Sequence, residues 1–342
     1  MISSDIHTKS DNLLYAGAAE IVITPTGSQF LWGYPHVERY STGVHDPLYS
    51  SAFYLDDGRS KVMFIANDII FVDKDITRRV RERITAETGI PSEAILVSAT
   101  HTHSGPMIVE YLSNRFDSAV PKPDRGYIDF LVDKMTAAGC AAARSVVPAR
   151  LEFALADGTG VGGNRRDPDN GAADPEVPVL AAVRADTGVP VGCMLVYSMH
   201  PTVLHEDSTL VSTDFPGAAK KYIREHVFGA GGSGGADGDA GNVPVIYHTG
   251  PAGNQSPRHA VKENTFAEAE QLGEMLGRRV EEAWKDRRVL DTDTLAAAST
   301  EINLPRRAFP EAEDARTKLD AARQRLEELR NRGAPRQEVR TA

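Results

Sequence analysis

Two histidines separated by one residue, His101 and His103, follow a short apolar run at Ile95 to Ala99 and precede a Ser-Gly-Pro turn. The run is typical of a buried strand that ends in a turn. If the extended geometry persists, both imidazoles project to the same side, because side chains alternate along a strand. Such a pair can bind a divalent metal ion, or serve a metal and an acid/base group. A polar loop with two solvated histidines is the alternative.

Three apolar runs of the chain share the same ending: each is followed by a His or Ser, with Pro or Gly nearby. They precede His101, His200 and Ser256. Function in α/β sheets gathers at the carboxyl ends of strands, so three such ends on one sheet edge would bring these residues and His103 together. Arg165, in a Gly-rich loop, could complete the site and hold a carboxylate or an oxyanion. Two histidines, a carboxylate and an open position for water form a common hydrolytic zinc site. Scattered loop polarity is the alternative.

Composition and charge restrict the class of protein. The chain has 342 residues, with 41% hydrophobic and 25% charged residues and a net charge of -10. The negative charge argues against nucleic-acid binding, and no apolar run approaches the roughly 18 residues of a membrane span. The N-terminus lacks the apolar segment of a secretory signal, so we expect a cytoplasmic protein unless the N-terminus is processed. Cys140 and Cys193 lie in apolar surroundings typical of core thiols. The oligomeric state stays open.

The order of the expected elements indicates an α/β protein, with α+β as the alternative. We expect a mixed multi-stranded sheet with flanking helices and a site at the strand ends. Strands are expected at 16–25, 51–55, 61–66, 95–99, 150–155, 177–184, 191–197 and 243–248. Helices are expected at 74–88, 127–145, 215–227 and 264–285. An Asp-Gly turn predicts that the second and third strands form a hairpin.

Three parts of the chain are expected to differ in organisation. Residues 1–14 form a disordered tail, residues 15–305 a catalytic domain, and residues 306–342 the beginning of a helical hairpin. Within the domain, residues 229–241 contain only Gly, Ser, Ala and Asp. They lack the GK[ST] ending of a phosphate loop and are expected to be a flexible surface insertion.

The C-terminal part contains a charged helix expected over 310–332. Its apolar residues, which include Leu319, Leu326 and Leu329, follow a narrow stripe of the kind found in helical hairpins and coiled coils. The Gly-Ala-Pro sequence that follows should end it. Because a lone helix with an apolar seam needs a partner, we expect the natural chain to continue beyond Ala342.

The stretch Ala99-Thr-His-Thr-His-Ser-Gly-Pro106 is the most specific of several that match a known family. It is similar to the ATHTHSGP stretch of the neutral/alkaline non-lysosomal ceramidases. Further similar motifs, in the same order, are Gly17 to Pro25, Gly33-Tyr34, Gly43-Val-His45, Asn164-Arg165, Ser198-Met-His200 and Gly253-Asn-Gln-Ser256-Pro257. The agreement extends over residues 16–290, most of the chain.

The resemblance implies a zinc-dependent amidohydrolase that acts on linear N-acyl amides, ceramide or a related compound, in sphingolipid metabolism. It assigns zinc binding to His101 and His200, and roles toward substrate and transition state to His103, Arg165 and Ser256. The family completes its zinc shell with a Glu and a Tyr from a later segment. No matching stretch is present here, so we expect these ligands beyond Ala342.

The expected mechanism follows from the residue types. Zinc would polarise the amide carbonyl and lower the pKa of a bound water to about 7. His103 could pass a proton to the leaving amine, and Arg165 could hold the developing oxyanion. The motif around Ser256 is not a GxSxG nucleophile elbow, which favours a hydrogen-bonding role for its hydroxyl.

Departures from the family pattern keep other substrates open. Met107-Ile108 stand where the family has Gly, Pro201 follows the second histidine, and Arg258 replaces Asn. Two alternatives therefore remain. One is a metal hydrolase of the same scaffold that acts on a small soluble amide, ester or lactam. The other is a catalytically incomplete fragment.

Overall fold

The structure is a computed structural model that describes residues 14–110, 117, 119–229, 243–291, 294–306, 308–334 and 339. The chain divides into two compact units, residues 1–298 and 299–342. The expected N-terminal tail up to residue 13 and residues 230–241 of the Gly-rich insertion lie outside the described residues. The first unit contains the whole sheet.

A nine-stranded mixed sheet forms the centre of the first unit. Its strands are β1 (Leu14–Val22), β3 (Tyr49–Asp56), β4 (Lys61–Asn67), β5 (Ile95–Ala99), β6 (Val147–Asp157), β8 (Glu176–Arg184), β9 (Pro190–Tyr197), β11 (Val245–Thr249) and β13 (Arg288–Val289). The order is β11-β9-β8-β6-β1-β3-β4-β5, with β13 paired to β6. β5 runs parallel to β4 and β11 parallel to β9, and the other pairs are antiparallel. The expected α/β architecture with a mixed sheet is confirmed.

Two short strand pairs lie outside this sheet. β2 (Gly43–Val44) pairs with β10 (Leu210–Val211), and β7 (Gly163–Asn164) pairs with β12 (Gln255–Ser256). Neither pair was expected from the sequence, because two-residue strands carry no periodic pattern. The second pair matters for the site, since it holds two loops that carry candidate residues.

The main helices begin and end where the sequence provides caps. α1 (Lys74–Thr88) begins after Asp73, whose side chain accepts a hydrogen bond from the Ile76 N–H, and ends at Gly89 in the left-handed conformation. The other helices of this unit are α2 (Arg125–Arg144), α3 (Phe215–Tyr222) and α4 (Phe266–Trp284). The expected helix over 215–227 changes to a π-helical turn at Ile223–Val227. Short 3-10 turns occupy Ser92–Ala94 and Pro257–His259.

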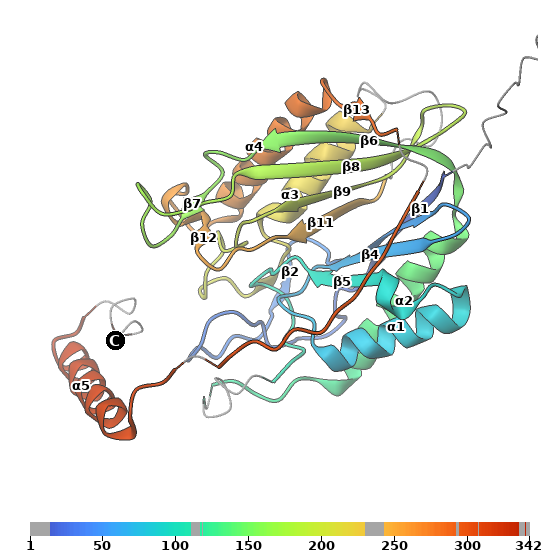
Figure 1. Cartoon of the computed structure of the whole chain (residues 1–342). Helices are drawn as coiled ribbons and strands as arrows, with labels where there is room; N and C mark the ends of the chain where they lie inside the picture. Colours follow the sequence, from blue (N-terminus) through green and yellow to red (C-terminus); the bar gives the residue numbers. More distant parts are fainter. Residues whose placement is uncertain are drawn as a thin grey trace, which may run out of the picture. The chain divides into compact units, whose positions relative to one another are not determined.

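The sheet folds back on itself, so that the first unit has four layers. β1 pairs with β6 at Leu14 to Ala16 alone, and beyond these residues the strands diverge into two sheet layers. α1 and α2 cover the layer of β1, β3 and β4, whereas α3 and α4 pack on the layer of β6, β8, β9 and β11 (Figure 1). Alternation along β3 shows both contacts: Ala52 and Tyr54 face the helices, and Phe53 and Leu55 face the other sheet layer.

As a result, β5 and β11, the first and last strands of the sheet order, lie next to each other. The Ser98 hydroxyl of β5 lies 2.7 Å from Nδ1 of His248 on β11, and the Thr249 hydroxyl donates to the Thr100 carbonyl at 2.6 Å. The sequence analysis expected three strand ends on one sheet edge. β5 and β11 are the two outermost strands of the strand order, so their ends would not be neighbours in a flat sheet. Folding of the sheet brings the ends together instead.

The second unit contains one helix in its described residues, α5 (Ala312–Asn331). It agrees with the helix expected over 310–332, and Leu329 of the apolar stripe is buried. Gly333 follows in the left-handed conformation, with φ of 64°. The part of the expected hairpin that follows Pro335 falls on residues that, except for 339, lie outside the described part. In the described residues, no helix is long and apolar enough to cross a membrane.

Candidate metal centre

His101 lies in the turn that follows β5. The backbone N–H groups of Thr100 and His101 donate to the carbonyls of Asn67 and Ile69, so this turn is bonded to the end of the neighbouring strand β4. His101 has φ of 68°, a left-handed conformation, so the extended geometry expected from the sequence ends before the histidines. The rings of His101 and His103 are nevertheless neighbours, with centroids 5.1 Å apart.

His200 approaches His101 from the other sheet layer. It lies three residues after β9, and its N–H donates to the Gln255 carbonyl at 3.1 Å. Nε2 of His200 is 3.1 Å from Nε2 of His101. Two histidines about 100 positions apart in the chain thus face each other with their Nε2 atoms.

The hydrogen bond made by Nδ1 of each ring identifies the tautomer of the two imidazoles. Nδ1 of His101 lies 2.8 Å from the Ile70 carbonyl, and Nδ1 of His200 lies 2.5 Å from the Ala252 carbonyl. A carbonyl oxygen only accepts, so Nδ1 carries the proton in both rings, and a neutral ring then has its lone pair on Nε2. Two lone pairs facing each other repel unless a cation lies between them. Two nitrogen ligands of a tetrahedral zinc ion lie about 3.3 Å apart, close to the observed separation.

His103 completes a cluster of three imidazoles. Among the described residues, one ring nitrogen from each of His101, His103 and His200 lies within 4.8 Å of the others. The ring of Tyr34 packs edge-on against His103 with centroids 5.3 Å apart, and the Tyr34 hydroxyl donates to the Leu204 carbonyl at 2.6 Å. The Tyr34 side chain thus forms one side of the cluster and is itself fixed by a hydrogen bond.

Burial keeps the three rings uncharged. It is the main cause that lowers the pKa of His101 and His103. It also lowers the pKa of His200 to about 4, with a smaller contribution from the neighbouring His101 imidazole, since the two rings disfavour each other's protonation. The guanidinium of Arg165 also lowers the pKa of His101 and His200, which places this positive charge near both rings. Neutral imidazole is the form that binds metal ions.

Arg165 is held beside the cluster by the paired strands β7 and β12. Its N–H donates to the Asn254 carbonyl and its Nη2 to the Gly253 carbonyl, both at 2.8 Å. The preceding Asn164 is buried, and its side-chain oxygen accepts hydrogen bonds from the N–H groups of Arg166 and Asp167. Asn164 therefore shapes the loop that presents the arginine.

Ser256 follows the segment that anchors His200, but its hydroxyl has a local partner. The side chain is buried and accepts a hydrogen bond from the Arg258 N–H at 3.3 Å, which caps the short turn at Pro257–His259. Ser256 is thus one residue from Gln255, whose carbonyl receives the His200 N–H.

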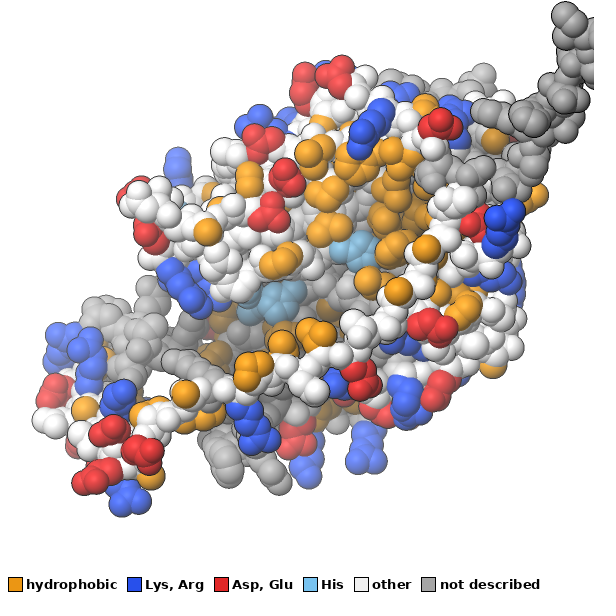
Figure 2. Space-filling view, in the orientation of Figure 1, with side chains coloured by type: hydrophobic (Ala, Val, Ile, Leu, Met, Phe, Trp, Pro, Cys, Tyr) orange, Lys and Arg blue, Asp and Glu red, His pale blue; other side chains and the backbone are white. Residues whose placement is uncertain are grey.

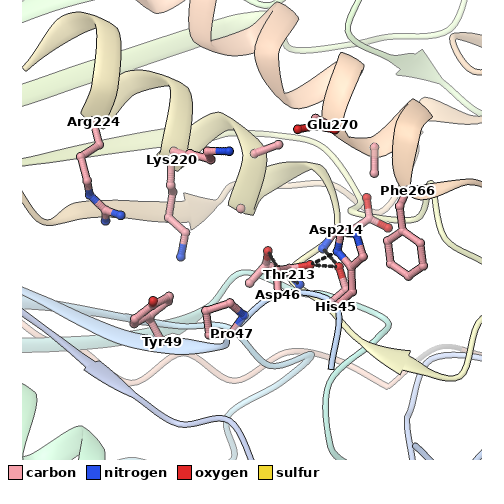
Figure 3. A pocket seen from close by; sticks show the side chains of 15 residues that line it. His45, Asp46, Pro47, Tyr49, Thr213, Asp214, Lys220, Arg224, Phe266 and Glu270 are labelled. Carbon is pink, nitrogen blue, oxygen red and sulfur yellow. Dashed lines mark hydrogen bonds and ion pairs between the residues drawn. The ribbon is translucent and has the colours of Figure 1, made fainter. Parts of the chain in front are cut away.

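Two other polar residues, His45 of the resembling motifs and Asp68 after β4, lie elsewhere. His45 stacks on Phe266 with centroids 3.8 Å apart and lines a cavity of about 360 Å³ next to α3 and α4, at which Lys220 and Asp46 also lie (Figure 3). Asp68 is buried in an ion pair with Lys220 at 2.8 Å. Lys220 pairs with Asp68 and Arg224 with Glu20, and neither carboxylate lines the cavity. None of the three clustered histidines lines it either.

The sequence analysis missed the residue that supports the histidine turn. Arg39 is buried and donates to the carbonyl of His103, the hydroxyl of Ser104 and the carbonyl of Ser208. Its guanidinium also lies over the Tyr34 ring, 5.2 Å from the centroid. No local pattern marks Arg39, whereas Gly33-Tyr34 was visible as a motif.

Comparison with known proteins identifies the family of the chain. The family model of the neutral/alkaline non-lysosomal ceramidase N-terminal region matches residues 15–258. The chain belongs to this family. Relatives within it include the neutral ceramidase of Pseudomonas aeruginosa, 23% identical over 295 residues, which cover 80% of this chain and 42% of the relative. The neutral ceramidase of Oryza sativa subsp. japonica is 24% identical over 220 residues, which cover 59% of this chain and 27% of the relative.

Solved ceramidases share the fold. The neutral ceramidase from Pseudomonas aeruginosa matches with a TM-score of 0.66 at 21% identity, over 80% of this chain and 45% of that chain. A ceramidase complexed with C2 matches with a TM-score of 0.68 at 20% identity, over 80% of this chain and 44% of that chain. This chain thus spans less than half the length of these relatives.

Proposed function

We propose that this chain carries the metal centre of a zinc-dependent hydrolase that cleaves an N-acyl amide bond, in ceramide or a related compound. The observation that carries the proposal is the pair of Nε2 atoms of His101 and His200, 3.1 Å apart, with both Nδ1 atoms on backbone carbonyls. The relatives, named neutral ceramidases, support the substrate class. A bound zinc ion would supply a polarised amide carbonyl and an acidic water.

Each proposed residue has a distinct role. His101 and His200 hold the metal ion. His103 stays neutral at pH 7 because burial lowers its pKa, so it can accept a proton and pass it to the leaving amine. Arg165, whose charge acts on both ligand histidines, stabilises the oxyanion that forms on the amide carbonyl. Ser256 orients the substrate or its own loop through its hydroxyl.

A substrate panel tests the proposal. The chain is stripped with a chelator, reloaded with Zn²⁺, and assayed for amine release from N-acyl amides of increasing acyl length. We expect hydrolysis that disappears on chelation and returns with zinc. His103→Gln and Arg165→Met should each lower kcat by about 100-fold or more, since each removes one contribution to the transition state. Arg166→Met, at the exposed neighbour, is the matched control and should leave kcat within about twofold of the unaltered chain.

Other results would favour the alternatives. Hydrolysis restricted to short soluble amides, esters or lactams would contradict the lipid substrate but still support the metal centre. Zinc uptake without hydrolysis of any substrate would identify a catalytically incomplete fragment.

A further inference from the structure

An apolar hollow lies between the two sheet layers. Strand pairing places Leu155, Leu180 and Met194 on the inner face of one layer, and Phe64 and Leu96 on the inner face of the other. Leu155 and Leu96 are 51% and 47% exposed, and the other three side chains are partly buried. Figure 2 shows hydrophobic side chains gathered around a recess with histidine at its floor. Contiguous apolar side chains exposed around a recess are typical of a ligand-binding site.

His248 and Ser98 lie where the layers close on each other. Nδ1 of His248 is 2.7 Å from the Ser98 hydroxyl, and the Phe64 ring lies edge-on to the imidazole at 6.3 Å. His248 is 7% exposed, and its Nε2 is buried with no hydrogen-bond partner in the part of the chain that the structure describes. A buried polar atom without a partner is destabilising, so a group that pairs with Nε2 recovers stability.

The same pair lies between the hollow and the metal centre. Ser98 is three residues before His101, and His248 pairs in register with Val196, four residues before His200. The Thr249 hydroxyl, one residue after His248, donates to the carbonyl of Thr100, which directly precedes His101. A chain that fills the hollow therefore meets His248 before it reaches the metal ligands.

We propose that the hollow binds the alkyl chain of the substrate and that Nε2 of His248 hydrogen-bonds a hydroxyl between that chain and the amide. The inference rests on the proposed function, because it names the recognition of the same substrate. A hydroxyl fits since it both donates and accepts. Nε2 is a donor if Ser98 donates to Nδ1, and an acceptor if Nδ1 donates to Ser98. His248 is thereby a specificity-determining residue that no motif marked.

A matched pair of ligands tests this assignment on the full zinc-loaded chain. N-decyl-N′-methylurea and N-(2-hydroxydecyl)-N′-methylurea differ by one hydroxyl and resist hydrolysis, so calorimetry measures binding alone. We expect the hydroxylated urea to bind at least about tenfold more tightly, because only it pairs with the buried nitrogen. His248→Phe should keep the apolar hollow and abolish this preference. His248→Gln, which retains a polar group, should keep part of it.

A control variant separates recognition from the closure of the sheet. Thr249→Val removes the neighbouring bond between the same two strands and should leave the preference unchanged. Equal binding of the two ureas, or an undiminished preference in His248→Phe, would overturn the proposal. Amide hydrolysis is measured separately. A chain that hydrolyses amides without the preference contradicts this inference alone, whereas a chain with the preference and no hydrolysis contradicts the proposed function.

Discussion

His101 and His200 turn the same ring nitrogen toward each other because each fixes its other nitrogen on a backbone carbonyl. Histidines that bind metal ions are usually oriented in this way, by a hydrogen bond from the ring nitrogen that does not bind the ion, and we propose the same role here. The sequence indicated which histidines to consider. It did not reveal the anchors, since Ile70 and Ala252 act through their carbonyl groups, which every residue possesses.

The pKa of His248 gives a prediction for stability against pH. Burial lowers this pKa to about 4 from 6.5, so between these values the unfolded chain binds a proton that the folded chain does not. The stabilisation is present above pH 6.5 and is lost as the pH falls toward 4. Urea unfolding at pH 7 and 4.5 should therefore show a smaller loss of unfolding free energy in His248→Gln than in the unaltered chain, by about 2 kcal/mol. An equal loss in both would contradict the buried neutral imidazole.

Gly33 gives a second prediction at this scale. Its φ is 132°, and a Cβ there would lie 2.3 Å from Nδ1 of His103. Gly33→Ala should therefore strain the backbone and displace the imidazole, lowering the unfolding free energy by about 1–3 kcal/mol. Gly27→Ala is the control, because a Cβ at Gly27 meets nothing within 4 Å. Thermal unfolding compares the two, and equal midpoints would show that His103 is not packed against Gly33.

At the scale of elements, the turn that carries the histidines depends on a distant arginine. Arg39 satisfies the carbonyls of His103 and Ser208 and the Ser104 hydroxyl from a buried position. Arg39→Met leaves these groups without a donor and should cost about 3 kcal/mol or more of unfolding free energy. Arg78→Met removes two exposed ion pairs, with Asp75 and Glu82, and should cost much less, because exposed ion pairs contribute little to stability. Similar costs for both variants, measured by denaturant unfolding, would refute the supporting role.

Most helices and strands could be predicted from the sequence, because the information that specifies them is local. α1 has buried residues every four positions, an Asp cap and a terminal glycine, and β3 and β4 flank an Asp-Gly turn. Two kinds of element were missed. The π-helical turn at Ile223–Val227 and the β7–β12 pair form through contacts between distant segments, which leave no periodic signal.

At the scale of the molecule, the folding-back of the sheet could not be predicted. It depends on the short pairing of β1 with β6 and on the meeting of β5 with β11, strands about 150 residues apart. The sequence correctly placed polar residues at strand ends, and the fold then brought three histidines together from two layers. Arg165 was predicted as well, but the strand pair that presents it was not.

A buried ion pair links α3 to the end of β4 in the opposite sheet layer. Nζ of Lys220 lies 2.8 Å from the Asp68 carboxylate, and both side chains are almost fully buried. Lys220→Met leaves the carboxylate unpaired and should cost about 3–5 kcal/mol of unfolding free energy. Adding Asp68→Asn removes the unpaired charge, so the double variant should regain part of the loss. A double variant less stable than Lys220→Met would contradict this account of the layer contact.

The most direct test of the central claim is the zinc content and zinc affinity of the purified chain. We expect about one zinc ion per chain, lost in His101→Ala and in His200→Ala because each removes one of the facing nitrogens. His226→Ala, at an exposed position on the helix extension, should retain the zinc content and affinity of the unaltered chain. A chain that binds no zinc, or a His101→Ala or His200→Ala variant that keeps the full affinity, would contradict the claim that these two imidazoles hold the metal.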